Sequence, residues 1–236
     1  MQHAKKNELK PHLSKYWKIP PDGNGAFVAA MEDVLSVYLR PYDPKFPVVC
    51  MDESSKQLVG EVAQPIPMAP GHPLLKDDEY VRKGVAEIFL AVEPLAGFRE
   101  VKITDRRTMV DWAVFIQDLV DGRYAAAERI VLVMDNLNTH GIASLYEAFP
   151  AAEALRIAQR LEIHHTPKRG SWLNIAEIEL SVFKRQCLPE RIPDIEEMRR
   201  MTKAWNMERN SRQNRVDWQF TAEDARIKLK RLYPKL

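Results

Sequence analysis

Apolar and polar positions along the chain follow two periods, which together predict five strands and a set of helices. Apolar runs, alternating or unbroken, predict strands at 46–53, 85–92, 98–104, 129–135 and 161–166. Apolar residues at helical spacing predict helices at 26–42, 108–120, 173–187, 194–210 and 221–232. A further helix is expected to begin at Pro150 and to run through Leu161. Segment 56–68 alternates only loosely, and its two prolines restrict it to an edge strand or an excursion.

The order of these elements predicts an α/β fold with a mixed five-stranded sheet. The early strands form an antiparallel meander through the short turn 93–97, and the later strands alternate with helices as βαβαβ crossovers do. The run 129–135 is apolar throughout, which is typical of a strand covered on both faces. We therefore expect helices on both faces of the sheet, and ligand chemistry at the carboxyl ends of its strands.

Composition excludes several classes of protein. The 236 residues suffice for one domain, or for a domain with a small appendage. No stretch approaches the roughly 18 consecutive apolar residues of a membrane span, and the N-terminus has no apolar core of a secretory signal. Cys50 and Cys187 form neither a disulfide framework nor a CxxC metal pair, so both are expected to be buried thiols in a reducing cytoplasm.

Charge is unevenly distributed, although the net charge is only +2. Residues 183–236 carry 14 Lys and Arg against 8 Asp and Glu. A basic end on a near-neutral protein is compatible with a polyanionic partner such as DNA. On charge alone, a solvated helical face with mixed charges explains the same pattern more simply.

Three acidic residues stand where the predicted elements bring side chains together. Asp52 is expected to end the first strand, Asp135 ends the fourth, and Glu177 lies about one turn into the helix after the fifth. If the first and fourth strands are neighbours, the two aspartates project from adjacent strand ends and Glu177 closes the site from its helix. Each acid taken singly is more simply a cap or a surface charge, whereas the shared placement favours a site.

The neighbouring acids are expected to point elsewhere. Glu53 follows Asp52 on a strand and therefore faces the opposite side of the sheet. Glu179 lies about 200° around the helix from Glu177, so the two cannot enter one site. Glu177 is the preferred third acid.

Three converging carboxylates repel one another unless cations lie between them. Oxygen ligands with spare positions suit Mg²⁺ or Mn²⁺, which also take substrate phosphates. Two such ions, about 3.5–4 Å apart, stabilise the attacking and leaving oxygens of an in-line phosphoryl displacement. The implied chemistry is phosphodiester cleavage or transfer, with water or a DNA 3′-hydroxyl as the nucleophile.

Polar residues near the acids are predicted to play secondary roles. Asn136 is assigned to the outer shell of the site, and His140 is either a helix-start residue or an outer-shell contact. The loop 166–174 carries Lys168 and Arg169 for phosphates, followed by Ser171 and by Trp172, which is expected either to stack on bases or to anchor the loop in the core.

Three stretches together resemble a known family: "VVCMDE", "VLVMDNLNTH" and "HHTPKRGSWLNIAEIELSVFKRQCL". They are similar to bacterial insertion-sequence transposases of the Tc/mariner superfamily, the IS six-thirty type of DDE superfamily endonucleases. The resemblance runs from about residue 10 to the end, and by motif it carries the catalytic, metal-binding triad onto Asp52, Asp135 and Glu177. It implies an RNase H-like domain that performs two-metal DNA cleavage and strand transfer.

The resemblance also implies a division of the chain and a set of partners. It predicts an N-terminal helical connector at 1–45, a catalytic domain at 46–190, and basic C-terminal helices at 191–236 packed on that domain. Expected partners are transposon ends and target duplex DNA, an N-terminal helix-turn-helix product, and a second copy of the chain if the active form is a homodimer. No membrane partner is expected, and the location is the bacterial cytoplasm, in association with the nucleoid.

The chain departs from the family pattern in three places. The interval between Asp135 and Glu177 is 41 residues, longer than is usual, and fits an inserted helix at Pro150. Arg169 stands where the family is expected to have His. Only about 45 residues precede the first strand, too few for the usual helix-turn-helix region, which suggests a truncated copy or a second reading frame. Two alternatives stay open: an incompetent remnant that binds DNA or a partner, and another RNase H-like nuclease.

Overall fold

The computed structural model describes residues 24–136, 140–188 and 191–234, so residues 1–23 of the helical connector predicted at 1–45 lie outside the described residues. The strands are β1 (Val48–Glu61), β2 (Tyr80–Glu93), β3 (Phe98–Thr104), β4 (Ile130–Met134) and β5 (Leu161–His165). The helices are α1 (Gly25–Tyr38), α2 (Met109–Asp121), α3 (Ile142–Ala148), α4 (Ala151–Ala158), α5 (Ile175–Cys187), α6 (Ile195–Arg212) and α7 (Ala222–Lys228), with short 3₁₀ turns at Ser171–Leu173 and Lys230–Leu232. None of these helices is both long enough and apolar enough to cross a membrane.

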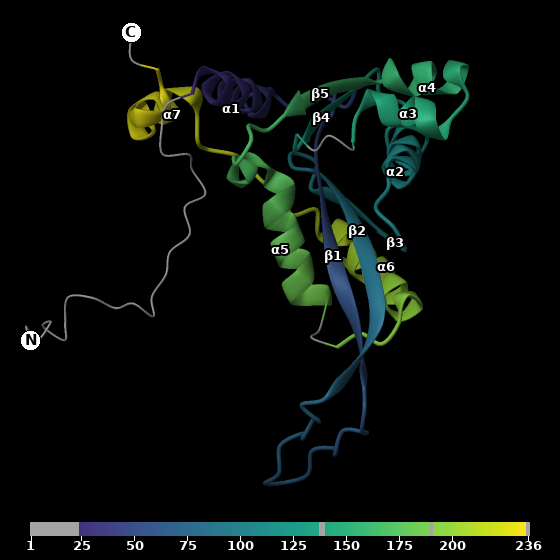
Figure 1. The fold of residues 1–236 in the computed structure, drawn as a ribbon. Coiled ribbons are helices and arrows are strands. Elements are labelled where there is room, and N and C mark those ends of the chain that lie inside the picture. Colours follow the sequence, from purple (N-terminus) through teal and green to yellow (C-terminus); the bar gives the residue numbers. More distant parts are fainter. Residues whose placement is uncertain (1–23, 137–139, 189–190, 235–236) are drawn as a thin grey trace, which may run out of the picture.

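The five strands form one mixed sheet in the order β3-β2-β1-β4-β5 (Figure 1). β1, β2 and β3 pair antiparallel, whereas β4 pairs parallel to both β1 and β5. The predicted meander followed by βαβαβ crossovers is confirmed. Helices lie on both faces of this sheet, with α1, α5 and α6 on one side and α2, α3 and α4 on the other (Figure 1).

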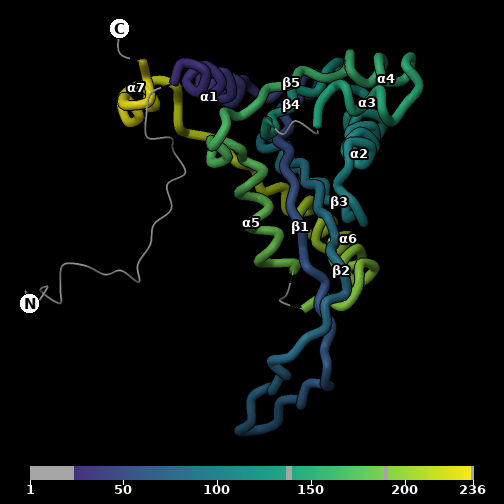
Figure 2. The backbone as a smooth tube through the Cα atoms, viewed as in Figure 1, coloured from purple at the N-terminus to yellow at the C-terminus, as the bar shows by residue number. Residues whose placement is uncertain are grey.

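The first strand is longer than predicted, and this expectation was wrong. β1 continues for 14 residues and pairs with β2 as far as Glu61, with a register shift at Leu58 and Val59. Beyond the sheet the two strands form a long arm that projects from the rest of the molecule (Figure 2). The run Ser54–Gln57 is polar although its backbone pairs with β2 throughout, and from Lys56 onward β2 no longer pairs with β3, so the hydrophobic pattern fades while the backbone pairing persists.

Side chains of the strands alternate between two cores. Cys50 and Val133 belong to the core beneath α5, whereas Met51 and Met134 belong to the core beneath α2. This alternation is the period of two that a strand requires, and it fixes the face to which each later residue points.

Helix α6 covers the outer edge of β3, the first strand of the sheet order. The Asn210 side chain accepts a hydrogen bond from the Arg99 backbone N–H and donates one to the Arg99 carbonyl, both at 2.8 Å. The Asn206 amide donates to the carbonyl of Val101 at 3.1 Å. Three polar groups of the edge backbone are therefore satisfied by side chains of a helix, as backbone groups shielded from water must be.

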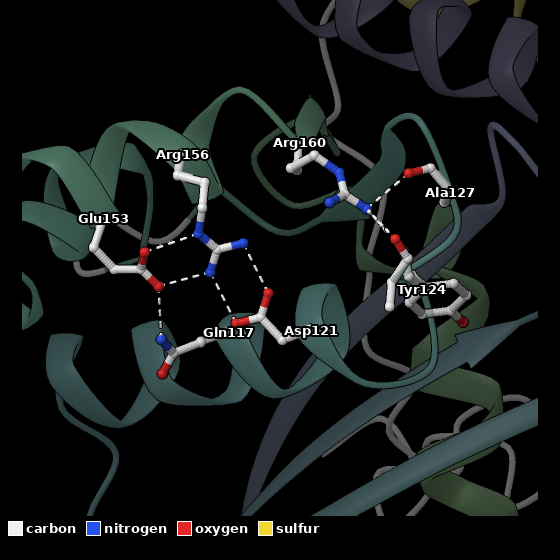
Figure 3. Close-up of polar contacts among 8 residues, drawn as sticks. Gln117, Asp121, Tyr124, Ala127, Glu153, Arg156 and Arg160 are labelled. Carbon is white, nitrogen blue, oxygen red and sulfur yellow. Dashed lines mark hydrogen bonds and ion pairs between the residues drawn. The ribbon is translucent and has the colours of Figure 1, made fainter.

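The interval between β4 and β5 is filled by α3 and α4, which lie beside α2 (Figure 1). Figure 3 shows the polar contacts that join α4 to α2. Arg156 of α4 makes two hydrogen bonds of 2.8 Å to Asp121 and also contacts Glu153, to which Gln117 donates at 3.0 Å. Arg156, followed by Gln117, lowers the pKa of Glu153 to about 2. Arg160 then donates to the carbonyl of Ala127 at 2.7 Å. The helix predicted from Pro150 through Leu161 is present as α4, with Pro150 as its N-cap, but it ends at Ala158, and Leu161 instead begins β5.

Candidate active site

The strand register brings Asp52 and Asp135 to the same height. The last paired residues of β1 and β4 are Cys50 and Val133, and each aspartate lies two residues further along its own chain. Neighbouring strands are about 4.8 Å apart, and a step of two keeps both side chains on the face of Cys50 and Val133. The expectation that Asp52 ends its strand was wrong, because β1 continues past it; what ends there is the pairing with β4.

Glu177 approaches from the same face. It lies in the first turn of α5, whose residues Ile175, Leu180 and Phe183 pack into the core that contains Cys50 and Val133. Asp52, Asp135 and Glu177 are all partly exposed at this point of the surface.

Glu179 points into the protein instead. Its carboxylate lies 2.8 Å from Arg99 Nε and 3.1 Å from Arg209 Nε, and the side chains of Arg99 and Glu179 are almost completely buried. A buried carboxylate with two guanidinium partners is fully engaged in a structural contact. This agrees with the placement of Glu177 rather than Glu179 in the site.

The other acids influence Asp52 electrostatically. Its pKa is raised to about 7, mainly by burial and in addition by the carboxylates of Asp135, Glu53 and Glu177, although the Glu53 backbone N–H opposes the shift by donating to Asp52 Oδ1 at 2.8 Å. Such a group is stabilised in its charged form by a nearby cation. An all-oxygen donor set fits Mg²⁺ or Mn²⁺.

The side chains as they stand are not a closed metal cage. Among residues 24–136, 140–188 and 191–234, no three His, Cys, Asp or Glu side chains lie close enough together to hold an ion. Magnesium sites in proteins commonly use one or two carboxylates and complete the shell with water and substrate phosphates. The observed donor set is compatible with that kind of open site.

Two residues that the sequence analysis did not select hold the backbone of the site. His165 donates from Nδ1 to the Asp135 carbonyl at 3.2 Å. Asn174 donates from Nδ2 to the Met51 carbonyl at 2.8 Å. Asn174 could have been found as a helix N-cap preceding an apolar run, but no local pattern marks His165.

His140 lies on the opposite face of the sheet from the three acids. Its Nδ1 is 2.7 Å from Glu53 Oε1, both side chains are nearly completely buried, and its ring stacks on Trp112 with centroids 6.0 Å apart. His140 therefore contacts Glu53 and the core beneath α2. Asn136 is exposed directly after Asp135, and its outer-shell role stays a prediction.

The loop after β5 presents charges on a tight turn. Lys168, Arg169 and Ser171 are exposed, and Arg169 adopts a left-handed φ of 67°. Gly170 is required next to it, since a Cβ there would lie 2.5 Å from Pro167 Cγ. Trp172 packs partly buried against the core and meets Phe220 edge to face, so its ring anchors the loop. Base stacking by Trp172 has no support in this arrangement.

Comparisons with known proteins agree with this architecture. The crystal structure of the Mos1 mariner paired end complex with Mn is 16% identical over 87% of this chain, with a TM-score of 0.51, and the corresponding complex with Mg is 14% identical over 96%, with a TM-score of 0.52. The chain spans 63% and 69% of those two proteins, and at this identity the likeness shows the RNase H-like fold alone. No curated protein matches the chain in sequence. The family model for the DDE superfamily endonuclease matches residues 47–199, and the chain therefore belongs to that family.

Proposed function

We propose that this chain is the catalytic domain of a DNA transposase, which cleaves phosphodiester bonds and transfers strands with the help of two divalent metal ions. The observation that carries the proposal is the convergence of Asp52, Asp135 and Glu177, from two neighbouring strands and one helix, on a single face. Membership of an endonuclease family supports the nuclease activity.

Each residue of the triad has a separate support. Asp52 is held in mid-strand by pairing with β2, Asp135 follows the buried strand β4, and Glu177 is fixed by the start of α5. Asp52, Asp135 and Glu177 would hold Mg²⁺ or Mn²⁺, which when bound would supply nucleophile activation and charge stabilisation at the leaving oxygen. The carboxylates bind and orient, and the rigid strands reduce the reorganisation that binding requires.

DNA is the proposed substrate and partner. The similar solved structures include Mos1 complexes described with Mn, with Mg and with a left transposon end. We extend divalent metal use and transposon-end binding from those proteins to this chain. Because the chain spans under two thirds of some of them, end recognition by a separate helix-turn-helix product and action as a homodimer belong to the same proposal.

The alternative is a scaffold that binds DNA without cutting it. The exposed Lys168 and Arg169 on the loop after β5 would support DNA contact without requiring cleavage. The two functions are separated by incubating the purified chain with Mg²⁺ or Mn²⁺ and duplex DNA that carries element ends. We expect this duplex to be nicked only when the divalent ion is present. DNA binding without any cut strand would support the scaffold. Preferential cutting of an RNA–DNA hybrid or a four-way junction would indicate another RNase H-like nuclease.

Arg169→Gly is expected to lower DNA affinity while leaving the stability of the fold almost unchanged. Glycine tolerates the left-handed φ without the Cβ clash, so we expect the free energy of unfolding to change by less than about 1 kcal/mol, although an Arg on a loop is lost. DNA affinity should fall, and the slope of log affinity against log salt should decrease by about 1. Arg169→Lys is the matched control, since it keeps the charge; equal DNA affinity of the Gly variant and the wild type would contradict the contact.

A further inference from the structure

The carbonyl of Met51 lies at the point where β1 loses its partner β4. The carbonyl of Pro47 accepts a hydrogen bond from Val131 of β4 at 3.0 Å. Carbonyls alternate in direction along a strand, so those of Val49 and Met51 point to the same side. The β1–β4 pairing ends at Cys50, and the Met51 carbonyl is therefore directed to the gap between the two strands that carry Asp52 and Asp135.

The side chain of Asn174 enters this gap. It is 1% exposed, and its Nδ2 donates to the Met51 carbonyl at 2.8 Å. Its Oδ1 accepts the backbone N–H of Ala176 at 3.1 Å, which caps the N-terminus of α5. One amide thus joins the helix that bears Glu177 to the strand that bears Asp52.

A second contact holds the same helix start from the other side. The Tyr38 hydroxyl of α1 donates to the carbonyl of Leu173 at 2.7 Å. Residue 173 is fixed to α1 while residue 174 is fixed to β1, so the first turn of α5 has little freedom to slide along the sheet. The Asn174 amide supplies both a donor for the strand, through Nδ2, and an acceptor for the helix, through Oδ1.

We propose that Asn174 is a positioning residue, whose amide sets the height of Glu177 relative to Asp52 and Asp135 and thereby the divalent-ion affinity of the site. The inference rests on the proposed metal-dependent function. If Asn174 only capped α5, its loss would destabilise the helix without changing the affinity for the divalent ion. The cap uses the amide oxygen, whereas the contact with β1 uses the amide nitrogen, so the two roles can be separated.

Asn174→Ser separates the two roles. Serine keeps the cap acceptor for Ala176 but is too short to reach the Met51 carbonyl. Asn174→Ala removes both contacts, and Thr221→Ala removes the cap of the distant helix α7 as a matched control. Asn174→Thr keeps the cap and fills more of the vacated volume, and it replaces the serine variant if that variant does not fold.

Three measurements are made on the full chain. Mn²⁺ binding is followed by the electron paramagnetic resonance signal of the free ion. Thermal unfolding is measured with a chelator present, and DNA nicking is measured as a function of Mn²⁺ concentration. We expect Asn174→Ser to bind Mn²⁺ 10- to 100-fold more weakly, the scale for residues that orient ligands, and its nicking to recover as Mn²⁺ is raised. Asn174→Ala should also unfold at a lower temperature, whereas Thr221→Ala should lower only the unfolding temperature.

Wild-type Mn²⁺ affinity in Asn174→Ser would overturn the positioning role. A wild-type chain that binds no Mn²⁺ at all, or an Asp135→Asn variant that binds it equally well, would overturn the proposed function and the inference with it. The two failures are therefore distinguishable.

Discussion

Asp135→Asn is expected to lower the rate of divalent-dependent DNA nicking by at least about a thousandfold while leaving the fold intact, because it removes a central carboxylate of the site without changing its volume. Asp135 follows β4, whose five residues are all buried, so the strand itself holds the position of the side chain. The loss should persist at high Mg²⁺, since the amide supplies a weaker, uncharged ligand. The measurement is a single-turnover assay on duplex DNA with element ends.

The matched control is Asp121→Asn, which makes the same chemical change at the end of α2 and breaks only the exposed ion pair with Arg156 (Figure 3). Exposed pairs contribute about 0–1 kcal/mol, so this control should nick DNA at the wild-type rate. Nicking by Asp135→Asn at a rate within tenfold of the wild type would remove Asp135 from the mechanism.

Asp52→Asn is expected to stabilise the metal-free chain at pH 8. The pKa of Asp52 is raised to about 7 by burial and by the neighbouring carboxylates, whereas an unfolded Asp has a pKa of about 3.9. Between these values the native state retains a proton that the unfolded state has lost, so the free energy of unfolding decreases as pH rises from about 4 to 7. Asparagine does not ionise, so the free energy of unfolding of the variant does not decrease in this way as the pH rises.

The size of the effect follows from the shift. At about 1.4 kcal/mol per pKa unit, the gain is at most about 4 kcal/mol at pH 8, and it falls below half of that at pH 5. Urea unfolding at both pH values, with a chelator present, measures it. Added Mg²⁺ should stabilise the wild type more than the variant, because the ion relieves the same repulsion. A variant that is less stable than the wild type at pH 8 would show that Asp52 is not strained by its neighbours.

The sheet could be predicted from the sequence because its signals are local. The unbroken apolar run of β4 and the clean alternation of β3 each identify a strand without reference to the rest of the chain, and the order of elements then limits the topology. The length of β1 could not be predicted in the same way. Its outer half is polar and is defined by pairing with β2, which is not encoded in the hydrophobic pattern.

The acids of the candidate site were selected from the sequence, but their supports were not. Asn174 contacts Met51 across 123 positions of the chain, and His165 contacts the backbone of Asp135 across 30. Such hydrogen bonds depend on the final register of strands and helices rather than on spacing. The side of the sheet occupied by His140 was likewise decided by tertiary packing against Trp112.

The contacts of Asn206 and Asn210 with β3 lie beyond residue 199, where the family match ends. A fragment trimmed to the matched region would keep all three acids and all five strands, yet it would remove the side chains that bond to the backbone of Arg99 and Val101 on the outer side of β3. Strands exposed in this way pair with one another between molecules. The matched region is therefore expected to precipitate or form aggregates when produced alone, and we expect the segment after residue 199 to keep the sheet soluble by covering this edge.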